Sequence, residues 1–285
     1  MPVILRLLGT GSPAPLPERQ GSALLLSHGH EHLLFDAGRG VTTQLVRAGV
    51  MPQELSAVLL THHHYDHIGN LGDLLLTAWH GGAKTLPVVG PPGTQTLVGA
   101  LFEHVYYREL LFSYALANAI GEPMPVIEQV VVGADIDDGG IYRRGRWHIS
   151  AAAVDHGRQL GLTYAEWPCL AYRVEIGGIS VVISGDTIVC ESLAQLANGA
   201  DVLVQCCYLA DAAIATPARR LLADTVIATS GQVGKLAARA GVKVLVLTHF
   251  APMTSAMLGV IEADVRRDYA GTLYLGEDLL TIELA

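Results

Sequence analysis

The stretch Thr61-His62-His63-His64-Tyr65-Asp66-His67 decides how the rest of the sequence is interpreted. It follows a short apolar run that predicts a buried β-strand. Four imidazoles buried without partners would be costly, whereas imidazole and carboxylate groups are ligands that zinc and similar divalent ions prefer. Because alternate residues of an extended segment point the same way, we expect His62 and His64 to bind one ion, and Asp66 and His67 to face a second.

The composition excludes several classes of protein. The chain has 285 residues, of which 51% are hydrophobic, and a formal net charge of -9. A chain this apolar can bury enough surface to fold, and four cysteines are too few for a disulfide scaffold. No apolar run reaches the roughly 18 residues that a membrane-spanning helix needs. Residues 1–6 also lack the pattern of a signal peptide, so we expect a cytoplasmic protein that does not associate with a membrane.

Short β-rich runs alternate with helical patterns along the whole chain. This alternation predicts mixed α/β layers, and no linker or repeat divides them, so we expect a single domain over residues 1–285. Strands are predicted at 149–154, 170–176, 179–183, 202–204 and 242–247, and a helix is predicted over 226–240 that ends at Gly241.

The segment 94–122 differs from the rest because it predicts two helices rich in aromatic residues. These residues are Phe102, Tyr106, Tyr107, Phe112 and Tyr114. Two interpretations stay open: the rings belong to the core face of amphipathic helices, or the segment is a helical insert that caps a pocket.

The pattern H-x-H-x-D-H at residues 62–67 resembles the signature of the metallo-β-lactamase superfamily. The other residues that this family places in the same order stand at the ends of predicted strands before and after this stretch. They are Asp36, His156, Asp186 and His249. The resemblance covers almost the whole chain. It implies a four-layer αββα sandwich.

Finer features resemble the ribonuclease Z and arylsulfatase branch of that superfamily. They are Leu-Gly-Thr-Gly-Ser-Pro at 8–13, Asp-Ala-Gly-Arg-Gly at 36–40, and the run 240–249 that ends in Leu-Thr-His. The resemblance implies two zinc ions per chain, with Mn²⁺ or Fe²⁺ as alternatives. It assigns one ion to His62, His64 and His156, the other to Asp66, His67 and His249, and makes Asp186 the bridge and Asp36 a residue that orients the ligands.

Such a site predicts hydrolysis. Two ions that share a water lower its pKa and supply a hydroxide, and they stabilise the anion that forms on attack. Asp66 is expected to be catalytic as well, because family members are thought to relay a proton through it. The bond cleaved could belong to an ester, a lactone, an amide, or a sulfate or phosphate ester.

Departures from ribonuclease Z favour a small-molecule substrate. Ribonuclease Z carries a Glu where this chain has Cys206, and a partner His near a segment that here reads Val226-Ile227-Ala228-Thr229-Ser230. Only 30 residues separate His156 from Asp186, without the long arm of the tRNA-processing enzymes. Together with the net charge of -9, these differences predict a small molecule as substrate and disfavour nucleic acid. Cys206 and Cys207 are expected to be small buried side chains.

Two alternatives stay open beside the small-molecule hydrolase. One is a ribonuclease Z-like phosphodiesterase that processes tRNA 3′ ends, and the other is an iron-dependent oxidoreductase. The resemblance also makes a homodimer an option, since related enzymes often pair.

Overall fold

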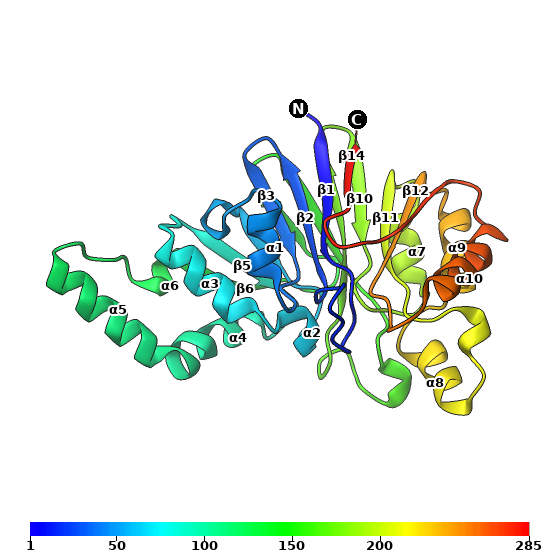
Figure 1. Cartoon of the computed structure of the whole chain (residues 1–285), viewed down its shortest axis with the longest axis horizontal. Helices are drawn as coiled ribbons and strands as arrows, with labels where there is room; N and C mark the ends of the chain where they lie inside the picture. Colours follow the sequence, from blue (N-terminus) through cyan, green and yellow to red (C-terminus); the bar gives the residue numbers. More distant parts are fainter. Residues whose placement is uncertain (285) are drawn as a thin grey trace.

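The computed structural model describes residues 1–284, and two seven-stranded sheets form its centre (Figure 1). The first sheet has the strand order β14 (Thr281–Leu284), β1 (Val3–Gly9), β2 (Ala23–His28), β3 (Glu31–Phe35), β4 (Ala57–Leu59), β5 (Leu86–Gly90), β6 (Val131–Asp135). The second has the order β13 (Thr272–Leu275), β12 (Val244–Thr248), β11 (Val202–Cys206), β10 (Ile179–Ile183), β9 (Leu170–Ile176), β8 (Trp147–Ala153), β7 (Ile141–Arg144).

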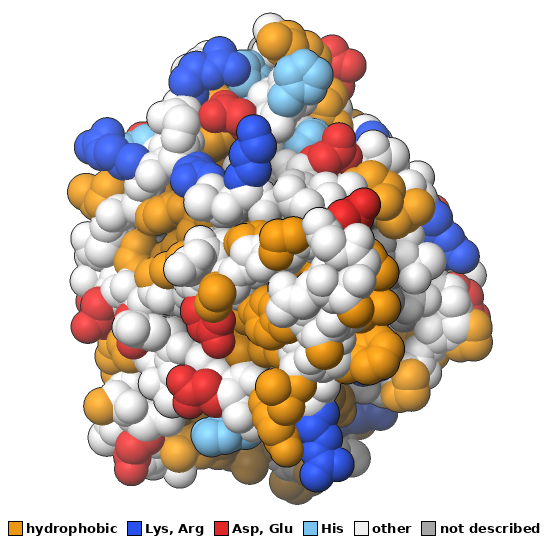
Figure 2. Space-filling view, turned by 90° about the vertical axis from the view of Figure 1, so that its left-hand side faces the viewer, with side chains coloured by type: hydrophobic (Ala, Val, Ile, Leu, Met, Phe, Trp, Pro, Cys, Tyr) orange, Lys and Arg blue, Asp and Glu red, His pale blue; other side chains and the backbone are white. Residues whose placement is uncertain are grey.

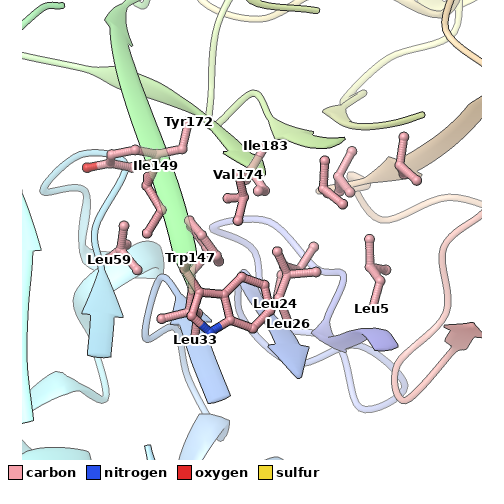
Figure 3. Packing of buried hydrophobic residues seen from close by; sticks show 14 of the residues in the cluster. Leu5, Leu24, Leu26, Leu33, Leu59, Trp147, Ile149, Tyr172, Val174 and Ile183 are labelled. Atoms are coloured by element: carbon pink, nitrogen blue, oxygen red, sulfur yellow. The ribbon is translucent and has the colours of Figure 1, made fainter. Parts of the chain in front are cut away.

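The two sheets face each other across one hydrophobic core. Strand β8 shows the cause, since alternate residues from Trp147 to Ala153 are buried and the intervening ones are not, which is the period of a strand with one face inward. Figure 3 shows side chains of both sheets meeting, with Trp147 and Ile149 from β8 opposite Leu33 and Leu59 from β3 and β4.

Helices cover the outer face of each sheet. The first sheet carries α1 (Val41–Arg47) and α3 (Leu71–His80), and the second carries α7 (Glu191–Ala197), α9 (Ser230–Ala240) and α10 (Ser255–Arg266). Helix α9 ends at Gly241, whose φ of 65° is the left-handed conformation expected of a glycine cap. The layers are therefore helix, sheet, sheet, helix, and the predicted αββα sandwich is confirmed.

Shorter elements connect these layers. The helices are α2 (Tyr65–Ile68), α6 (Ile127–Val130) and α8 (Pro217–Thr225), and the single 3₁₀ turns are η1 (Pro52–Glu54), η3 (Arg158–Leu160) and η4 (Asp211–Ala213). Within residues 1–284, no helix is long and apolar enough to cross a lipid bilayer.

The aromatic segment forms α4 (Thr94–Ala100), the π-helical turn η2 (Leu101–Val105) and α5 (Tyr107–Ile120), as the sequence predicts in outline. Helix α5 lies at the far end of the first sheet in Figure 1. Phe102 is buried, and the Tyr114 ring packs edge-on against Trp79 of α3 at 5.4 Å. Phe112 and Tyr107 are exposed. A single domain over 1–285 with this segment as a cap stays a prediction, and residue 285 lies outside the described residues.

Candidate metal centre

Five chain segments bring the predicted residues to one edge of the sandwich. His62 and His64 follow β4 in an extended segment, and the next turn of chain is α2, which carries Asp66 and His67. His156, Asp186 and His249 follow β8, β10 and β12. Because β10, β11 and β12 run parallel, their carboxyl ends meet at the same edge, as is common for functional sites of α/β sheets.

Two residues that follow strands, His249 after β12 and Asp36 after β3, adopt backbone conformations that most residues avoid. His249 has a φ of 62° and Asp36 a φ of 58°, both in the left-handed region. Such strain persists only where the surroundings hold it, and it is concentrated at functional sites. Gly185, with a φ of 58°, turns the chain before Asp186, and a Cβ there would lie 2.8 Å from the Thr61 Cβ.

The first group of potential ligands consists of His62, His64, His156 and Asp186. One donor atom from each lies within 4.8 Å of all the others. His64 Nδ1 is 2.9 Å from His62 Nε2 and 3.2 Å from His156 Nε2. Ligands about 2.0–2.1 Å from a tetrahedral ion are roughly 3.3 Å apart, so this spacing suits a divalent cation.

The second group consists of Asp66, His67 and His249. His249 Nε2 is 3.2 Å from Asp66 Oδ2, and His67 Nε2 is 3.7 Å from the same oxygen. Asp186 lies between the two groups, because its carboxylate is 3.6 Å from His67, 3.3 Å from His249 and 4.0 Å from His156. The structure therefore brings all seven predicted residues together, with Asp186 in the position of a bridge.

Buried polar atoms without partners support a fit to metal ions. His67 Nε2 and Asp186 Oδ1 have no hydrogen-bond partner within residues 1–284. Buried polar atoms usually find a partner, so such atoms that converge on one point need a ligand to satisfy them. Imidazole and carboxylate donors in this number suit zinc and related ions.

Neighbouring groups fix the orientation of the imidazoles. His67 Nδ1 donates to Asp36 Oδ2 at 2.7 Å, which turns Nε2 toward the site. The Thr61 amide donates to the other oxygen of Asp36 at 2.8 Å. His156 Nδ1 donates to the carbonyl of Val226 at 2.6 Å. Asp36 therefore fixes the orientation of the His67 ring.

The pKa values favour cation binding. Burial lowers the pKa of His62 well below its usual value and that of His64 to about 4, so both rings stay neutral and keep a lone pair free. Burial also disfavours charge on His67 and Asp186. Neighbouring carboxylates nevertheless raise the pKa of His67, and the His249 and His67 imidazoles hold the pKa of Asp186 well below its usual value. A bound cation would stabilise the ionised Asp186 carboxylate in the same way as these imidazoles.

Four groups lie next to the candidate ligands in addition to the predicted residues. The Val226 carbonyl belongs to the backbone, so the residue type does not indicate it in the sequence. Thr61 lies inside the histidine stretch, where a threonine does not by itself indicate a role at the site. Trp167 packs on the His64 ring at 4.6 Å, and Tyr208 lies 6.2 Å from the His249 ring. These two rings stand beside the candidate ligands, whereas Trp79 and Phe102 belong to the core cluster under α3 and α4.

Cys206 and Cys207 are buried free thiols, as expected. Burial, reinforced by the carboxylate of Asp186, raises the pKa of Cys206 well above its usual value. The thiol therefore stays protonated beside the candidate bridge and does not take over the charge of a Glu at this position.

Comparisons with known proteins agree with this geometry. The family model for the metallo-beta-lactamase superfamily matches residues 16–151. Ribonuclease Z of Mycolicibacterium paratuberculosis is 36% identical over 98% of this chain and 97% of its own length. Ribonuclease Z of Mycobacterium marinum is 36% identical over 98% of both.

Solved structures share the fold along nearly the whole chain. The metallo-beta-lactamase fold protein YhfI from Bacillus subtilis has a TM-score of 0.76 at 20% identity, covering 99% of this chain and 100% of its own. Human tRNase Z, short form, has a TM-score of 0.70 at 21% identity, covering 99% of both chains. The protein is a metal-dependent hydrolase with the metallo-β-lactamase fold. It belongs to the ribonuclease Z branch of the metallo-β-lactamase superfamily.

One prediction is wrong. The sequence favours a small-molecule substrate and disfavours nucleic acid, but relatives 36% identical along almost the whole chain are named Ribonuclease Z. The net charge of -9 misleads because it averages the whole surface, whereas a substrate meets only the charges around one site.

Proposed function

We propose that the protein is a ribonuclease Z-type phosphodiesterase that processes the 3′ ends of precursor tRNA. The observation that carries the proposal is the pair of ligand groups around Asp186, in a chain 36% identical to Ribonuclease Z over 98% of its length. A tRNA substrate also agrees with a cytoplasmic location.

Seven residues would hold two metal ions, for which zinc is our first choice. His62, His64 and His156 would hold one and Asp66, His67 and His249 the other, with Asp186 shared. When bound, two such ions supply a Lewis acid for the phosphate and a water of lowered pKa as nucleophile. Asp36 keeps His67 in the tautomer that presents Nε2, because it accepts the proton of Nδ1.

Asp66 is the residue we assign to proton transfer. Asp66 lies in the first turn of α2, and its carboxylate is 3.2 Å from His249 Nε2. Burial would raise the pKa of Asp66, but the His249 and His67 imidazoles outweigh burial and lower it. The ionised carboxylate can therefore accept a proton from the attacking water. The Cys206 thiol stays neutral, so it is not a second base.

Two arginines are carried by the segments that flank the site, despite the acidic total. Arg158 on η3 follows His156 by two residues, and its guanidinium lies 5.4 Å from the Tyr164 ring centre. Arg219 is exposed on α8, whose C-terminus reaches the site through the Val226 carbonyl. Such local charges can contact phosphates.

Cleavage of a precursor tRNA with a 3′ trailer tests the proposal. We expect the metal-loaded protein to release the trailer, and Asp186→Ala to lose both bound metal and at least a hundredfold of the rate. Asp73→Asn, which changes an exposed carboxylate on α3, is the matched control. Faster hydrolysis of a small ester than of precursor tRNA in terms of kcat/KM, or purified protein that holds iron and shows redox activity, would contradict it.

A further inference from the structure

An apolar cavity of about 490 Å³ lies beneath α8, and its lining includes Ala251, two residues after His249. Its walls come from the segment after β11, from α8 and from the start of α10, which lie close together at the lower right of Figure 1. The lining includes Tyr208, Leu222, Met253 and Met257, with Arg219 as its single charged residue. This size and this composition are typical of a small ligand subsite.

Tyr208 connects the cavity to the metal ligands. It lines the cavity, and its ring centre lies 6.2 Å from that of His249 at an interplanar angle of 46°. A group in contact with Tyr208 is therefore separated from His249 by a single side chain. The methionine side chains in the lining are flexible and polarisable, so they can pack against flat rings of different shape.

Arg219 brings an available positive charge to the rim. Its Nη1 donates to the Ala213 carbonyl at 3.0 Å, and its backbone amide donates to Thr216 Oγ1 at the start of α8. Across residues 1–284, no carboxylate lies within 4.0 Å of its guanidinium. The guanidinium is thus held in place while four of its five donors remain open to an anion.

A second cavity also has Met253 in its lining, and its charges indicate on which side an anionic chain would leave the metal centre. Its charged lining residues are three carboxylates, Glu18, Glu277 and Asp278, and one arginine, Arg19, so negative charge predominates there. These carboxylates repel a phosphate, so an anionic chain that leaves the metal centre is favoured on the Arg219 side.

We propose that the cavity beneath α8 is a nucleotide subsite that takes one unpaired nucleobase next to the scissile phosphodiester. The base stacks on Tyr208 and packs against the two methionines, and the adjacent phosphate pairs with Arg219. Stacking on aromatic rings accepts any base, and arginine pairs with phosphate in a bidentate manner. The inference rests on the proposed function, because it assumes an RNA substrate at the metal centre.

Paired variants on one helix test the subsite. Arg219→Gln and Arg220→Gln remove the same charge one residue apart on α8, but only Arg219 lines the cavity. We expect Arg219→Gln to raise KM for precursor tRNA about tenfold with kcat within twofold of wild type, and to lower the salt dependence of binding by about one phosphate contact. Arg220→Gln should change KM less than twofold.

Tyr208 has its own variants. Tyr208→Ala should weaken binding of a fluorescent 2′-O-methyl RNA oligonucleotide about tenfold in anisotropy titrations, while Tyr208→Phe keeps the stacking face and restores it. Metal content should match wild type in all variants. Equal effects of Arg219→Gln and Arg220→Gln, or no effect of Tyr208→Ala, would overturn the subsite alone. Failure of the wild type to cleave precursor tRNA would instead overturn the proposed function.

Discussion

Asp36 shows how one residue outside the ligand set controls the site. Its left-handed backbone is held by the Thr61 amide and hydroxyl, which donate to its carboxylate. The same carboxylate accepts the proton of His67 Nδ1. The contacts that hold the strained backbone of Asp36 thus also fix the tautomer of His67. A neutral side chain at position 36 would hold that tautomer less firmly.

Asp36→Asn should therefore weaken metal binding by the second group. We expect a tenfold to hundredfold loss of affinity there and a smaller effect on the first group, because His67 contacts Asp36 directly whereas His62 is linked to it only through the Thr61 hydroxyl. Metal content measured by mass spectrometry after dialysis should fall from two ions per chain toward one. Asp73→Asn, at an exposed carboxylate, should keep both ions. Two retained ions in Asp36→Asn would contradict this account.

Helix α9 is an element whose start is set by a network of side chains. Asp211 Oδ1 accepts from the Thr229 hydroxyl at 2.7 Å and from the Gly231 amide at 3.1 Å. A carboxylate at a helix N-terminus satisfies free amides and interacts favourably with the helix dipole. α9 packs against β12, the strand that His249 directly follows, so its start supports the site.

Asp211→Asn should lower stability in a pH-dependent way. Burial would raise the pKa of Asp211, but the Thr229 hydroxyl, the Gly231 amide and the Arg267 guanidinium outweigh it and lower the pKa below the usual 3.8. A lowered pKa contributes stability that is present above the unfolded value and lost as the pH falls through the folded value. We expect a loss of about 1 kcal/mol at pH 7.

Thermal unfolding at several pH values measures this effect. The difference in Tm between wild type and Asp211→Asn should be about 2–4 °C at pH 7 and should shrink below about pH 4. Asp268→Asn, at an exposed carboxylate of the chain after α10, is the control and should change Tm little. A difference that is constant from pH 3 to pH 7 would show that the carboxylate charge is not involved.

At the scale of the whole molecule, most of the fold and of the candidate site could be predicted from the sequence, because the candidate ligands directly follow predicted strands. The spacing of His62, His64 and Asp66 and the polar ends of later strands have direct signals in the sequence. The Val226 carbonyl and the cavity around Tyr208 have none, because they arise only when distant segments pack together. The prediction of the substrate class is wrong for the same reason, since the net charge of the chain does not show where its arginines lie in the fold.

Helix α5 leads to the last prediction, a homodimer through the outer end of the first sheet. Phe112, Leu116 and Ile120 recur every four residues on one side of α5 and are 66%, 50% and 62% exposed. Figure 2 shows hydrophobic side chains gathered over this face. Exposed apolar patches of this kind mark interfaces, and an apolar stripe is complementary to itself across a twofold axis.

Light scattering after size-exclusion chromatography tests the pairing. We expect the wild type to elute as a dimer and Phe112→Asp or Leu116→Asp to elute as monomers, since each buries a charge in the contact. Val46→Asp, at a similarly exposed apolar residue on α1, should remain dimeric. The metal content of the monomeric variants should be unchanged, because no residue of α5 lies among the ligand groups. A monomeric wild type would show that the stripe has another occupant.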